Sequence, residues 1–547
     1  MKIWKRVIAV SLTIWCGFFV GCINKETQVQ RGDVSQILYL GNGAEPESLD
    51  PHIVTGLTEY AVMASLFEGL VGEDPDDLSP EPGSAKKWDI SEDGKTYTFF
   101  IRKGAKWSNG DRLTAHDFAY SFERILNPIL GAEYAYMLYP LKNAQQYNKG
   151  EIKSFAKVGA RAINDYELIL ELENETPYFL QLLTHFAWWP VNKTVIEKFK
   201  TNDVRSTPWT REQNIVTNGP FTLKEWRVNK HIIVEKNPQY WDAETVRLKQ
   251  IHFFPITDLK TEESDFRAGR LHVTSSVPIH EIENYKKNKP EKIKTHASLS
   301  TYYYLLNTNR KPLDDVRVRK ALAYSINREE ITKYVTKGGE EPAYHFTPPG
   351  TNGYTSKKLF KYDLEKAKKL LAEAGYPNGE GFPELEILYN TKDSHRSIAE
   401  VIQQMWFKNL NIKVNLLNQE WKVYLDTRAN QNYDIGRAGW VGDYNDPNTF
   451  LDLWVKDGGN NHTGWNHSRY DELITLASQT KDRETRFSYF QEAETLLMDE
   501  MPAMPLHFSV SKFLIQKSVK GWSSNILNHH PYKYVYLDSV VEKSLEN

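Results

Sequence analysis

The stretch GRAGWVGDYNDPNTFLDLW, residues 436–454, sets charged side chains among large aromatic ones. Its polar and aromatic members are Arg437, Asp443, Asp446, Asp452, Trp440, Tyr444, Phe450 and Trp454. Charged side chains in such an apolar environment can serve three kinds of chemistry: the acid/base pair of an enzyme, the oxygen ligands of a metal, or the counter-charge for a bound cation. The rest of the chain has to decide among them.

The length and charge of the chain limit the choice. A chain of 547 residues is long enough for two to four domains, since single cores stop growing near ~250–300 residues. The 68 Lys and Arg residues are spread against 71 Asp and Glu residues, and the net charge is −3. No basic block could neutralise a run of phosphates, so nucleic acid is excluded as a partner.

The N-terminus has the form of a secretion signal. MKIWKRVIAVSLTIWCGFFVGC begins with basic residues and continues with an apolar run too short to span a bilayer. Its end, FVGC, resembles the lipobox of bacterial lipoproteins and predicts a signal peptide over residues 1–21 with a lipid on Cys22. The alternative is an ordinary signal peptide cut near Gly21. Since Cys16 and Cys22 are the only cysteines, the mature body has no disulfide and no thiolate metal site.

Local patterns predict several elements of the body. Residues 22–36 are polar and without apolar periodicity, which predicts a flexible tether. Helices are expected at LTEYAVMASLFEGL, at DLEKAKKLLAEAG with Asp363 as N-cap, and at DRETRFSYFQEAETLLMDEM before Pro502. An Asp93-Gly94 turn between alternating strands predicts a β-hairpin. Strands and helices alternate throughout, which indicates an α/β or α+β fold with interleaved domains.

Most catalytic and metal-binding signatures are absent. There is no HExxH, no GxSxG elbow and no GxxxxGK[ST] loop. In DYNDPNTFLDLW the alternating oxygen ligands of a calcium loop are broken at Pro447. The adjacent His529 and His530 lie in a turn-like segment and are expected in a surface loop without a role. These absences weaken the enzyme and metal interpretations.

Ordered matches along nearly the whole mature chain carry a resemblance. They include ESLDPHIV, SLFEGLVGEDP, TNGPFTLKEW, NPQYWD, LDDVRVRKALAYSINRE, LNQEWKVYLDTR, RAGWVGDYNDP and DEMPAMPLHF. In these motifs the chain resembles the peptide-binding proteins of bacterial ABC importers, the family that includes the oligopeptide- and dipeptide-binding proteins. The resemblance implies a periplasmic-binding-protein-like α/β fold of class II, in which two lobes close over a ligand and an extra domain is inserted.

The resemblance also implies domain boundaries. Lobe I is expected to combine residues 37–70, 190–299 and 507–547. The extra domain is expected over residues 71–189, and lobe II over residues 300–506.

The opening stretch then receives a role from the resemblance. Asp443 matches the acid that accepts the peptide's α-amino group, with Trp440 and Tyr444 excluding water. Asp446 is better explained as a helix cap before Asn448. The backbones of Gly439 and Val441, with that of Leu57 in lobe I, match the positions that pair with the peptide main chain, a contact indifferent to side chains.

Other matched positions concern the rest of the peptide. Tyr303, Trp421 and Trp440 are candidates for walls of side-chain pockets, although each could equally be a core residue. The peptide carboxylate is expected to meet Arg437, Arg428 or His395, the histidine only when protonated or through a hydrogen bond. Lys337 is a weaker candidate, since its match is offset by one residue.

The leading interpretation is a lipid-anchored receptor that captures short peptides, closes by a hinge and delivers them to the permease and ATPase subunits of an ABC importer. It is expected to be a monomer without cofactor or metal, held on the outer face of the cytoplasmic membrane through Cys22. A second interpretation keeps the fold but changes the ligand to a murein peptide, dipeptide, signalling peptide or metal chelate. A third is a peptidase or glycosidase that pairs Asp443 with Asp446 or Glu420.

Overall fold

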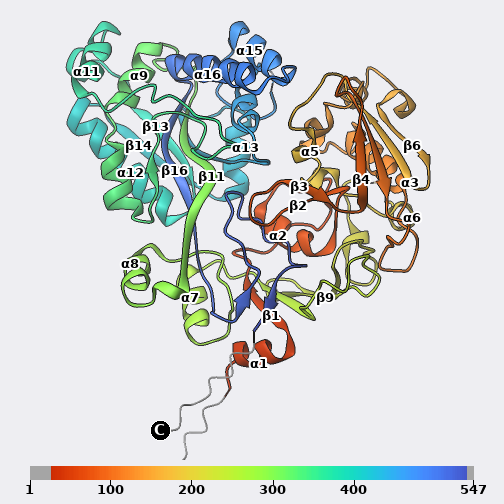
Figure 1. The fold of residues 1–547 in the computed structure, drawn as a ribbon. Helices are drawn as coiled ribbons and strands as arrows, with labels where there is room; N and C mark the ends of the chain where they lie inside the picture. The colour runs from red at the N-terminus through yellow and green to blue at the C-terminus, as the bar shows by residue number, and fades with distance from the viewer. Residues whose placement is uncertain (1–25, 202, 457, 539–547) are drawn as a thin grey trace, which may run out of the picture.

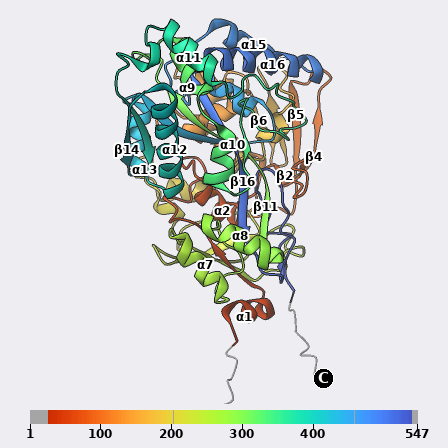
Figure 2. The same cartoon turned by 90° about the vertical axis from the view of Figure 1, so that its left-hand side faces the viewer.

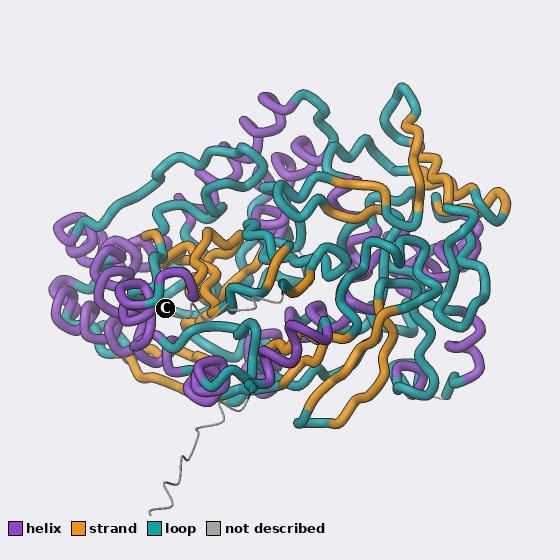
Figure 3. The backbone as a smooth tube through the Cα atoms, turned by 60° about the horizontal axis from the view of Figure 1, so that its bottom comes forward, coloured by secondary structure: helices purple, strands orange, loops and turns teal. Residues whose placement is uncertain are grey.

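The computed structural model describes residues 26–201, 203–456 and 458–538, so the predicted signal peptide and Cys22 lie outside the described residues. Three bodies, each built on one main sheet, make up the molecule (Figures 1 and 2). We call them lobe I, with strand order β1-β10-β9-β8, the extra domain, with β4-β5-β7-β6, and lobe II, with β12-β16-β11-β15-β13-β14. Helices, strands and loops are interleaved in all of them (Figure 3).

Lobe I is assembled from distant parts of the chain. Its sheet consists of β1 (Ile37–Gly41), β10 (Gln250–Phe254), β9 (His231–Lys236) and β8 (Phe221–Arg227). β1 pairs in parallel with β10, and the other pairs are antiparallel. Its helices are α2 (Leu57–Leu66), α6 (Lys193–Lys198), α7 (Leu259–Arg267) and α8 (Ile279–Asn288). The helix predicted at LTEYAVMASLFEGL is confirmed as α2, which ends at Leu66.

The extra domain contains the predicted hairpin. β4 (Ala85–Ile90) and β5 (Thr96–Ile101) pair antiparallel, and Gly94 takes a φ of 67° in the turn between them. The sheet continues through β7 (Glu167–Glu171) and β6 (Ala160–Asn164). Further elements are β2 (Val71–Glu73), β3 (Pro80–Pro82), α3 (Ala115–Leu126), η1 (Glu133–Leu138), α4 (Ala144–Asn148), α5 (Phe179–Leu182) and η3 (Phe186–Trp188).

Lobe II carries the largest sheet and the predicted helices. Its strands are β11 (Ile293–Leu306), β12 (Glu341–Pro342), β13 (Leu385–Asn390), β14 (Val414–Gln419), β15 (Ile435–Val441) and β16 (Ala503–Leu514). Its main helices are α9 (Val316–Tyr324), α11 (Leu364–Glu373), α12 (Asp393–Leu410), α13 (Trp421–Ala429), α14 (Asn448–Leu451), α15 (Ser468–Ser478) and α16 (Arg483–Glu500). Asp363 caps α11 by accepting from Lys366 N at 3.0 Å, and α16 ends before Pro502, both as predicted.

Two long strands run from one lobe into the other (Figure 1). β11 and β16 pair antiparallel along most of their length, with a register shift between Ala297 and Thr301. At the lobe I end, the Leu514 N–H donates to Thr274 Oγ1 at 2.9 Å. The boundaries predicted at 299/300 and 506/507 therefore fall inside continuous strands.

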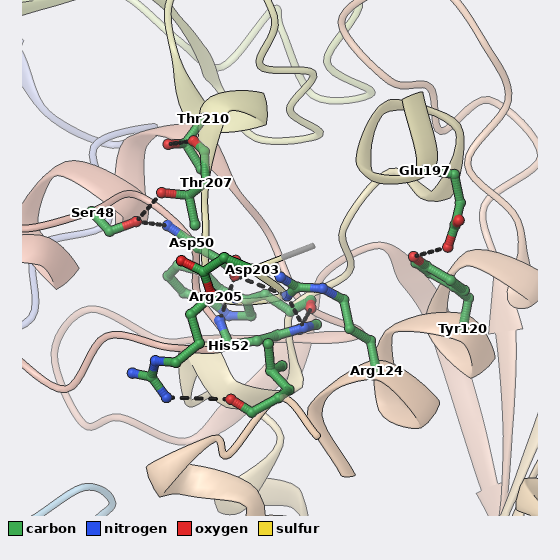
Figure 4. A network of polar contacts seen from close by, with 12 residues as sticks. Ser48, Asp50, His52, Tyr120, Arg124, Glu197, Asp203, Arg205, Thr207 and Thr210 are labelled. Atoms are coloured by element: carbon green, nitrogen blue, oxygen red, sulfur yellow. Dashed lines mark hydrogen bonds and ion pairs between the residues drawn. The ribbon is translucent and has the colours of Figure 1, made fainter. Parts of the chain in front are cut away.

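A buried ionic network joins lobe I to the extra domain (Figure 4). Arg124 of α3 donates to Asp50 through Nη1 at 3.0 Å and Nη2 at 2.5 Å, and its Nη1 lies 2.9 Å from His52 Nδ1. His52 Nε2 lies 3.1 Å from the carbonyl of Trp189, which can only accept, so this nitrogen carries the hydrogen. Burial, followed by the charge of Arg124, lowers the pKa of His52 to about 3. The ring is neutral, and the charges of the network are those of Arg124 and Asp50.

The prediction of a tether over residues 22–36 is wrong for its second half. α1 (Gln28–Ser35) forms there, with a capping box between Thr27 and Gln30. Asp33 Oδ1 lies 3.1 Å from Nε2 of the fully buried His272, which belongs to lobe I. The sequence shows no apolar periodicity because only Val29 and Gly32 of this helix are buried. Capping and a polar contact with a distant histidine hold the helix in place.

Candidate functional site

Asp443 follows β15 and lies between lobe II and the extra domain. The hydroxyls of Tyr134 and Tyr136, both in η1, donate to its carboxyl oxygens at 3.0 Å and 3.4 Å. Its backbone N–H donates to Thr449 Oγ1 at 3.2 Å. Only 11% of the side chain is exposed. The acid is thus nearly buried and is held by hydroxyls from another domain.

The carboxyl of Asp443 has no charged partner in the described part of the chain. Its nearest basic group is His185, whose Nε2 lies 4.0 Å from Oδ1. Burial lowers the pKa of His185 to about 3, and its Nδ1 accepts from Ala187 N, so the ring is neutral. Burial, only partly offset by the two tyrosine hydroxyls, raises the pKa of Asp443 to about 7. The charged form of Asp443 therefore has no cation beside it among the described residues.

The two neighbouring acids are already engaged. Asp446 forms a two-pronged ion pair with the buried Arg486, at 2.8 Å and 2.6 Å, and accepts from Asn448 N at 2.9 Å. The N-cap position of α14 is Pro447 and not Asp446, so the contact with Asn448 N agrees with the predicted cap only in part, and the ion pair with Arg486 was not predicted. Burial raises the pKa of Asp452 well above its ordinary value, and its Oδ2 accepts from Asn448 Nδ2 at 3.0 Å. Because Arg486 holds Asp446, this acid is not available to Asp443 as the second member of a catalytic pair.

β15 has a free edge over its second half. On one side it pairs with β11 along its whole length. On the other side, β13 pairs only with Ile435 and Gly436. In the part of the chain that the structure describes, no strand pairs with the backbone beyond Gly436 on that side.

The direction of the backbone groups shows which residues face this edge. The Gly442 N–H donates to Leu299 O on β11 at 2.7 Å. In an antiparallel ladder alternate residues point to opposite neighbours, so residues 437, 439 and 441 point away from β11. The Tyr424 hydroxyl indeed donates to the carbonyl of Arg437 from that side. The backbones of Gly439 and Val441 therefore face the free edge, where an extended chain could pair with them.

Two arginines lie near this edge without a carboxylate partner among the described residues. Arg437 stands 4.7 Å above the ring of Tyr302, and its Nη1 lies 3.3 Å from Asn390 Oδ1. Arg428 stands 5.7 Å from the ring of Tyr424. The Nε atom of each arginine is buried and has no acceptor. Among the described residues, no carboxylate is paired with either guanidinium group.

His395, in the first turn of α12, belongs to the same region. The hydroxyl of Tyr302 lies 3.3 Å from its Nδ1. Burial, followed by the charges of Arg437 and Lys392, pushes its pKa far below the usual range. The ring is neutral, so of the two modes predicted for His395 only a hydrogen bond is available to it.

Tyr303 lies in the core of lobe II. It is 5% exposed and packs edge-on against Phe346 and Trp454, with ring centres 5.0 Å and 5.7 Å away. Since side chains alternate along a strand, it points to the face of β11 opposite to Tyr302. The structure favours the core alternative over a pocket wall for this residue.

The remaining predicted residues are scattered around the site. Trp440 is partly buried and donates from Nε1 to Thr449 Oγ1 at 3.4 Å, close to Asp443. Leu57 begins α2 and is 60% exposed. Lys337 is exposed, in a left-handed turn with φ 56°. The side chain of Trp421 lies outside the described residues.

The sequence did not reveal the hydroxyl donors of the site. Tyr134 and Tyr136 lie 309 and 307 residues from Asp443 in the chain. Their spacing of two residues in EYAYML was the only local signal. Such contacts depend on how the extra domain sits against lobe II, which no local pattern encodes.

His529 and His530 lie in a loop, as predicted, but their side chains are half-buried and not on the open surface. His529 Nδ1 lies 2.7 Å from Glu73 Oε2, with 15% of its side chain exposed. His530 stacks on Trp522 with ring centres 4.1 Å apart. The two side chains point apart, as expected of neighbours, but each packs against another segment.

Within residues 26–201, 203–456 and 458–538, no group of three His, Cys, Asp or Glu side chains is arranged to hold a metal ion. Over the same residues, no helix combines the length and the apolar character needed to cross a membrane.

Residues 79–462 match the family model of bacterial extracellular solute-binding proteins, family 5 (middle part). The chain is 37% identical over 521 residues to the periplasmic oligopeptide-binding protein OppA of Salmonella typhimurium, covering 94% of this chain and 93% of the relative. It is 39% identical over 489 residues to the oligopeptide-binding protein OppA of Bacillus subtilis, covering 87% and 88%. The chain belongs to family 5 of the bacterial extracellular solute-binding proteins.

The solved structures confirm the fold class. The structure of the Escherichia coli murein tripeptide binding protein MppA superposes with a TM-score of 0.85 at 35% identity, covering 92% of this chain and 98% of that one. The unliganded open form of MppA gives a TM-score of 0.71 at the same identity, covering 92% and 97%.

Proposed function

We propose that this protein is the extracytoplasmic substrate-binding component of an ABC importer and captures short peptides by their free N-terminus and backbone. The observation that carries the proposal is the buried Asp443 carboxyl, which lacks a cation and stands at the end of a strand with a free edge. The relatives named as oligopeptide-binding proteins support it.

The charges of the site match those of a zwitterionic peptide. Moving an unpaired ion out of water costs several kcal/mol, so both ends of a buried peptide need partners. Asp443 supplies one for the ammonium, and Arg437 or Arg428 supplies a two-pronged one for the carboxylate. Distances from Asp443 to the arginines then select among peptide lengths.

The backbones of Gly439 and Val441 supply binding contacts that do not depend on the sequence of the peptide. An extended peptide that pairs with them adds a strand to the sheet of lobe II, in the manner of β-augmentation. Leu57 at the start of α2 is proposed to contact the peptide from lobe I. The peptide is bound and released unchanged, since the protein acts as a receptor and not as an enzyme.

Hinge closure is proposed to occur between lobe I (residues 37–70, 190–299 and 507–547) and lobe II (residues 300–506), with the extra domain over 71–189. The closed receptor, a monomer, delivers its peptide to the permease and ATPase subunits.

A lipid on Cys22 is proposed to hold the receptor on the outer face of the cytoplasmic membrane. Cells fed radiolabelled palmitate should label the wild-type protein and leave a Cys22→Ser variant unlabelled. Label that persists in the variant contradicts the anchor.

Calorimetric titration tests the function. Tri-, tetra- and pentapeptides of alanine should bind the purified protein, whereas N-acetylated copies and the Asp443→Asn variant should give at least tenfold weaker binding, the equivalent of about 1.4 kcal/mol. Asp426→Asn, which changes an exposed acid of α13, is the matched control and should bind like wild type. Equal binding of acetylated peptides would remove Asp443 from the site and point to a ligand without a free amine.

A further inference from the structure

The segment that follows β15 places two consecutive side chains of lobe II among groups of the extra domain. The Asp443 carboxyl accepts from the hydroxyls of Tyr134 and Tyr136. Tyr444 is 3% exposed and belongs to the hydrophobic core of the extra domain, whereas the apolar side chains at 450, 451, 453 and 454 belong to the core of lobe II. One aromatic ring thus crosses from lobe II into another domain, directly beside the acid proposed to bind the peptide's ammonium.

The ring of Tyr444 stacks on Tyr178, the residue before α5. The ring centres lie 5.5 Å apart, and the ring planes are inclined by 2°. Tyr178 is 6% exposed, and the guanidinium of Arg486, in α16, stands 4.9 Å from its ring centre. Stacked aromatic rings attract each other beyond their area of burial, and a cation–π contact is strongest where water is excluded. Two groups of lobe II therefore hold one buried ring of the extra domain.

Tyr444 is also fixed within its own lobe. Its hydroxyl accepts from Asn448 Nδ2 at 3.0 Å, and its carbonyl accepts from Asp446 N at 2.9 Å. Asp446 is in turn held by Arg486. Since Asp443 and Tyr444 share one planar peptide unit, the position of the docked ring determines where the backbone presents the Asp443 carboxyl.

Opening of the proposed hinge breaks these contacts. The ion pair of Arg124 and Asp50 joins the extra domain to lobe I, so the extra domain moves with lobe I and away from lobe II. The motion exposes the rings of Tyr444 and Tyr178 to water, which is unfavourable for buried aromatic surface. It also takes Asp443 away from the hydroxyls of η1. The lobes therefore cannot open without undocking the ring and displacing the acid together.

We infer that Tyr444 is a positioning residue of the peptide site: its ring, docked in the core of the extra domain, sets Asp443 against the peptide's ammonium and holds the lobes closed around the peptide. The inference rests on the proposed function and adds a determinant of peptide release. A contact that forms as the lobes close acts after the peptide has met the open site. It should therefore control the dissociation rate far more than the association rate.

Stopped-flow tryptophan fluorescence of the full protein, mixed with tetra-alanine, measures both rates. In Tyr444→Leu the dissociation rate should rise about tenfold, whereas the association rate should change by less than about threefold. Tyr444→Phe keeps the stacked ring and should restore most of the wild-type residence time. Tyr178→Leu removes the other ring and should resemble Tyr444→Leu. Because both changes break one contact, the double variant should release the peptide at about the rate of either single variant.

A change at the edge of the same contact avoids the buried rings. Lys481 Nζ lies 3.2 Å from Glu175 Oε1, and their side chains are 71% and 25% exposed. Glu175→Lys sets like charges opposite each other between lobe II and the extra domain. It should raise the dissociation rate about threefold at low ionic strength and much less in concentrated salt. This variant tests the contact even where a buried substitution prevents folding.

Tyr362→Leu, which changes a tyrosine of lobe II that is 37% exposed, is the matched control and should keep the wild-type rates. Dissociation rates that stay unchanged in Tyr444→Leu, Tyr178→Leu and Glu175→Lys, with tetra-alanine still bound, overturn the inference and leave the proposed function intact. A Tyr444→Phe variant that releases the peptide as fast as Tyr444→Leu also overturns it, because the docked ring is then not the holding group. Failure of the wild-type protein to bind any peptide overturns the inference together with the proposed function.

Discussion

Two opposing effects bring the pKa of Asp443 to about 7, so this acid is close to half-protonated at neutral pH. Removal from water disfavours its charged form, whereas hydrogen bonds from Tyr134 and Tyr136 favour it, and the first effect is larger. If the proposed function holds, the ammonium of a bound peptide shifts this balance toward the carboxylate. The buried carboxylate is therefore stabilised more by a cation than by the little water that reaches it.

This balance predicts that peptide affinity depends on pH. Below the pKa of about 7, Asp443 must lose a proton before it can pair with an ammonium, so Kd should fall about tenfold when the pH rises from 5.0 to 6.0. Titrations in buffers of different ionisation enthalpy should show close to one proton released per peptide over this range. The Asp443→Asn variant should lose both effects. A wild-type affinity that stays constant over the same pH range contradicts the assignment.

At the scale of elements, local patterns predicted α2, α11, α16 and the β4–β5 hairpin, because each buries an apolar stripe or contains a specific cap or turn. They did not predict α1, whose stability comes from a capping box and from a histidine far along the chain. In the site, the motif around Asp443 identified the acid, and the resemblance supplied its role. The donors from η1 stayed hidden because their contact exists only when two domains meet.

The free edge of β15 predicts an alternating response to backbone methylation. Tetra-alanine peptides methylated at single amide nitrogens should lose about tenfold in affinity where the N–H pairs with Gly439 or Val441, since a backbone partner is then left unsatisfied. Methylation of the intervening amide should have a much smaller effect. Calorimetric titration of each methylated peptide measures this. Replacing Ala with Ser at the same positions is the control, and uniform tolerance of methylation would exclude strand pairing.

At the scale of the whole molecule, the network of Asp50, His52 and Arg124 fixes the extra domain to lobe I. Removing one member of a buried ion pair costs about 3–5 kcal/mol, because the other charge stays buried alone. We expect Arg124→Met to lower the free energy of unfolding of the protein by that amount in urea titrations. The double change with Asp50→Asn should recover part of the loss. Arg161→Met, which breaks the more exposed pair with Glu171, should change stability by about 1 kcal/mol or less.

Neutral histidines predict that the protein loses stability in acid. Burial holds several of them at a pKa of about 3 or 4: His52, His185, His252, His462, His507 and His530. Between pH 6.5 and 4 these histidines bind protons in the unfolded chain and not in the folded one. Each therefore lowers the free energy of unfolding by about 1.4 kcal/mol for every unit by which the pH falls. Buried carboxyl groups with raised pKa values act in the opposite direction but are fewer; they include Asp443 and Glu262, with pKa values of about 7, and Asp452.

Urea titrations between pH 7 and 5 should therefore show a falling free energy of unfolding. The fall should be smaller in His52→Gln. An unchanged dependence in this variant would mean that His52 is charged in the folded protein.

The contact between Gln36 and Leu537 has a consequence for the order of folding. The side chain of Gln36 donates to the Leu537 carbonyl at 2.6 Å and accepts from its N–H at 3.2 Å, across 501 residues of chain. This contact can form only after almost the entire polypeptide has been synthesised. The extra domain, in contrast, can fold from one continuous segment of the chain. The first lobe to leave the ribosome is the last to be completed.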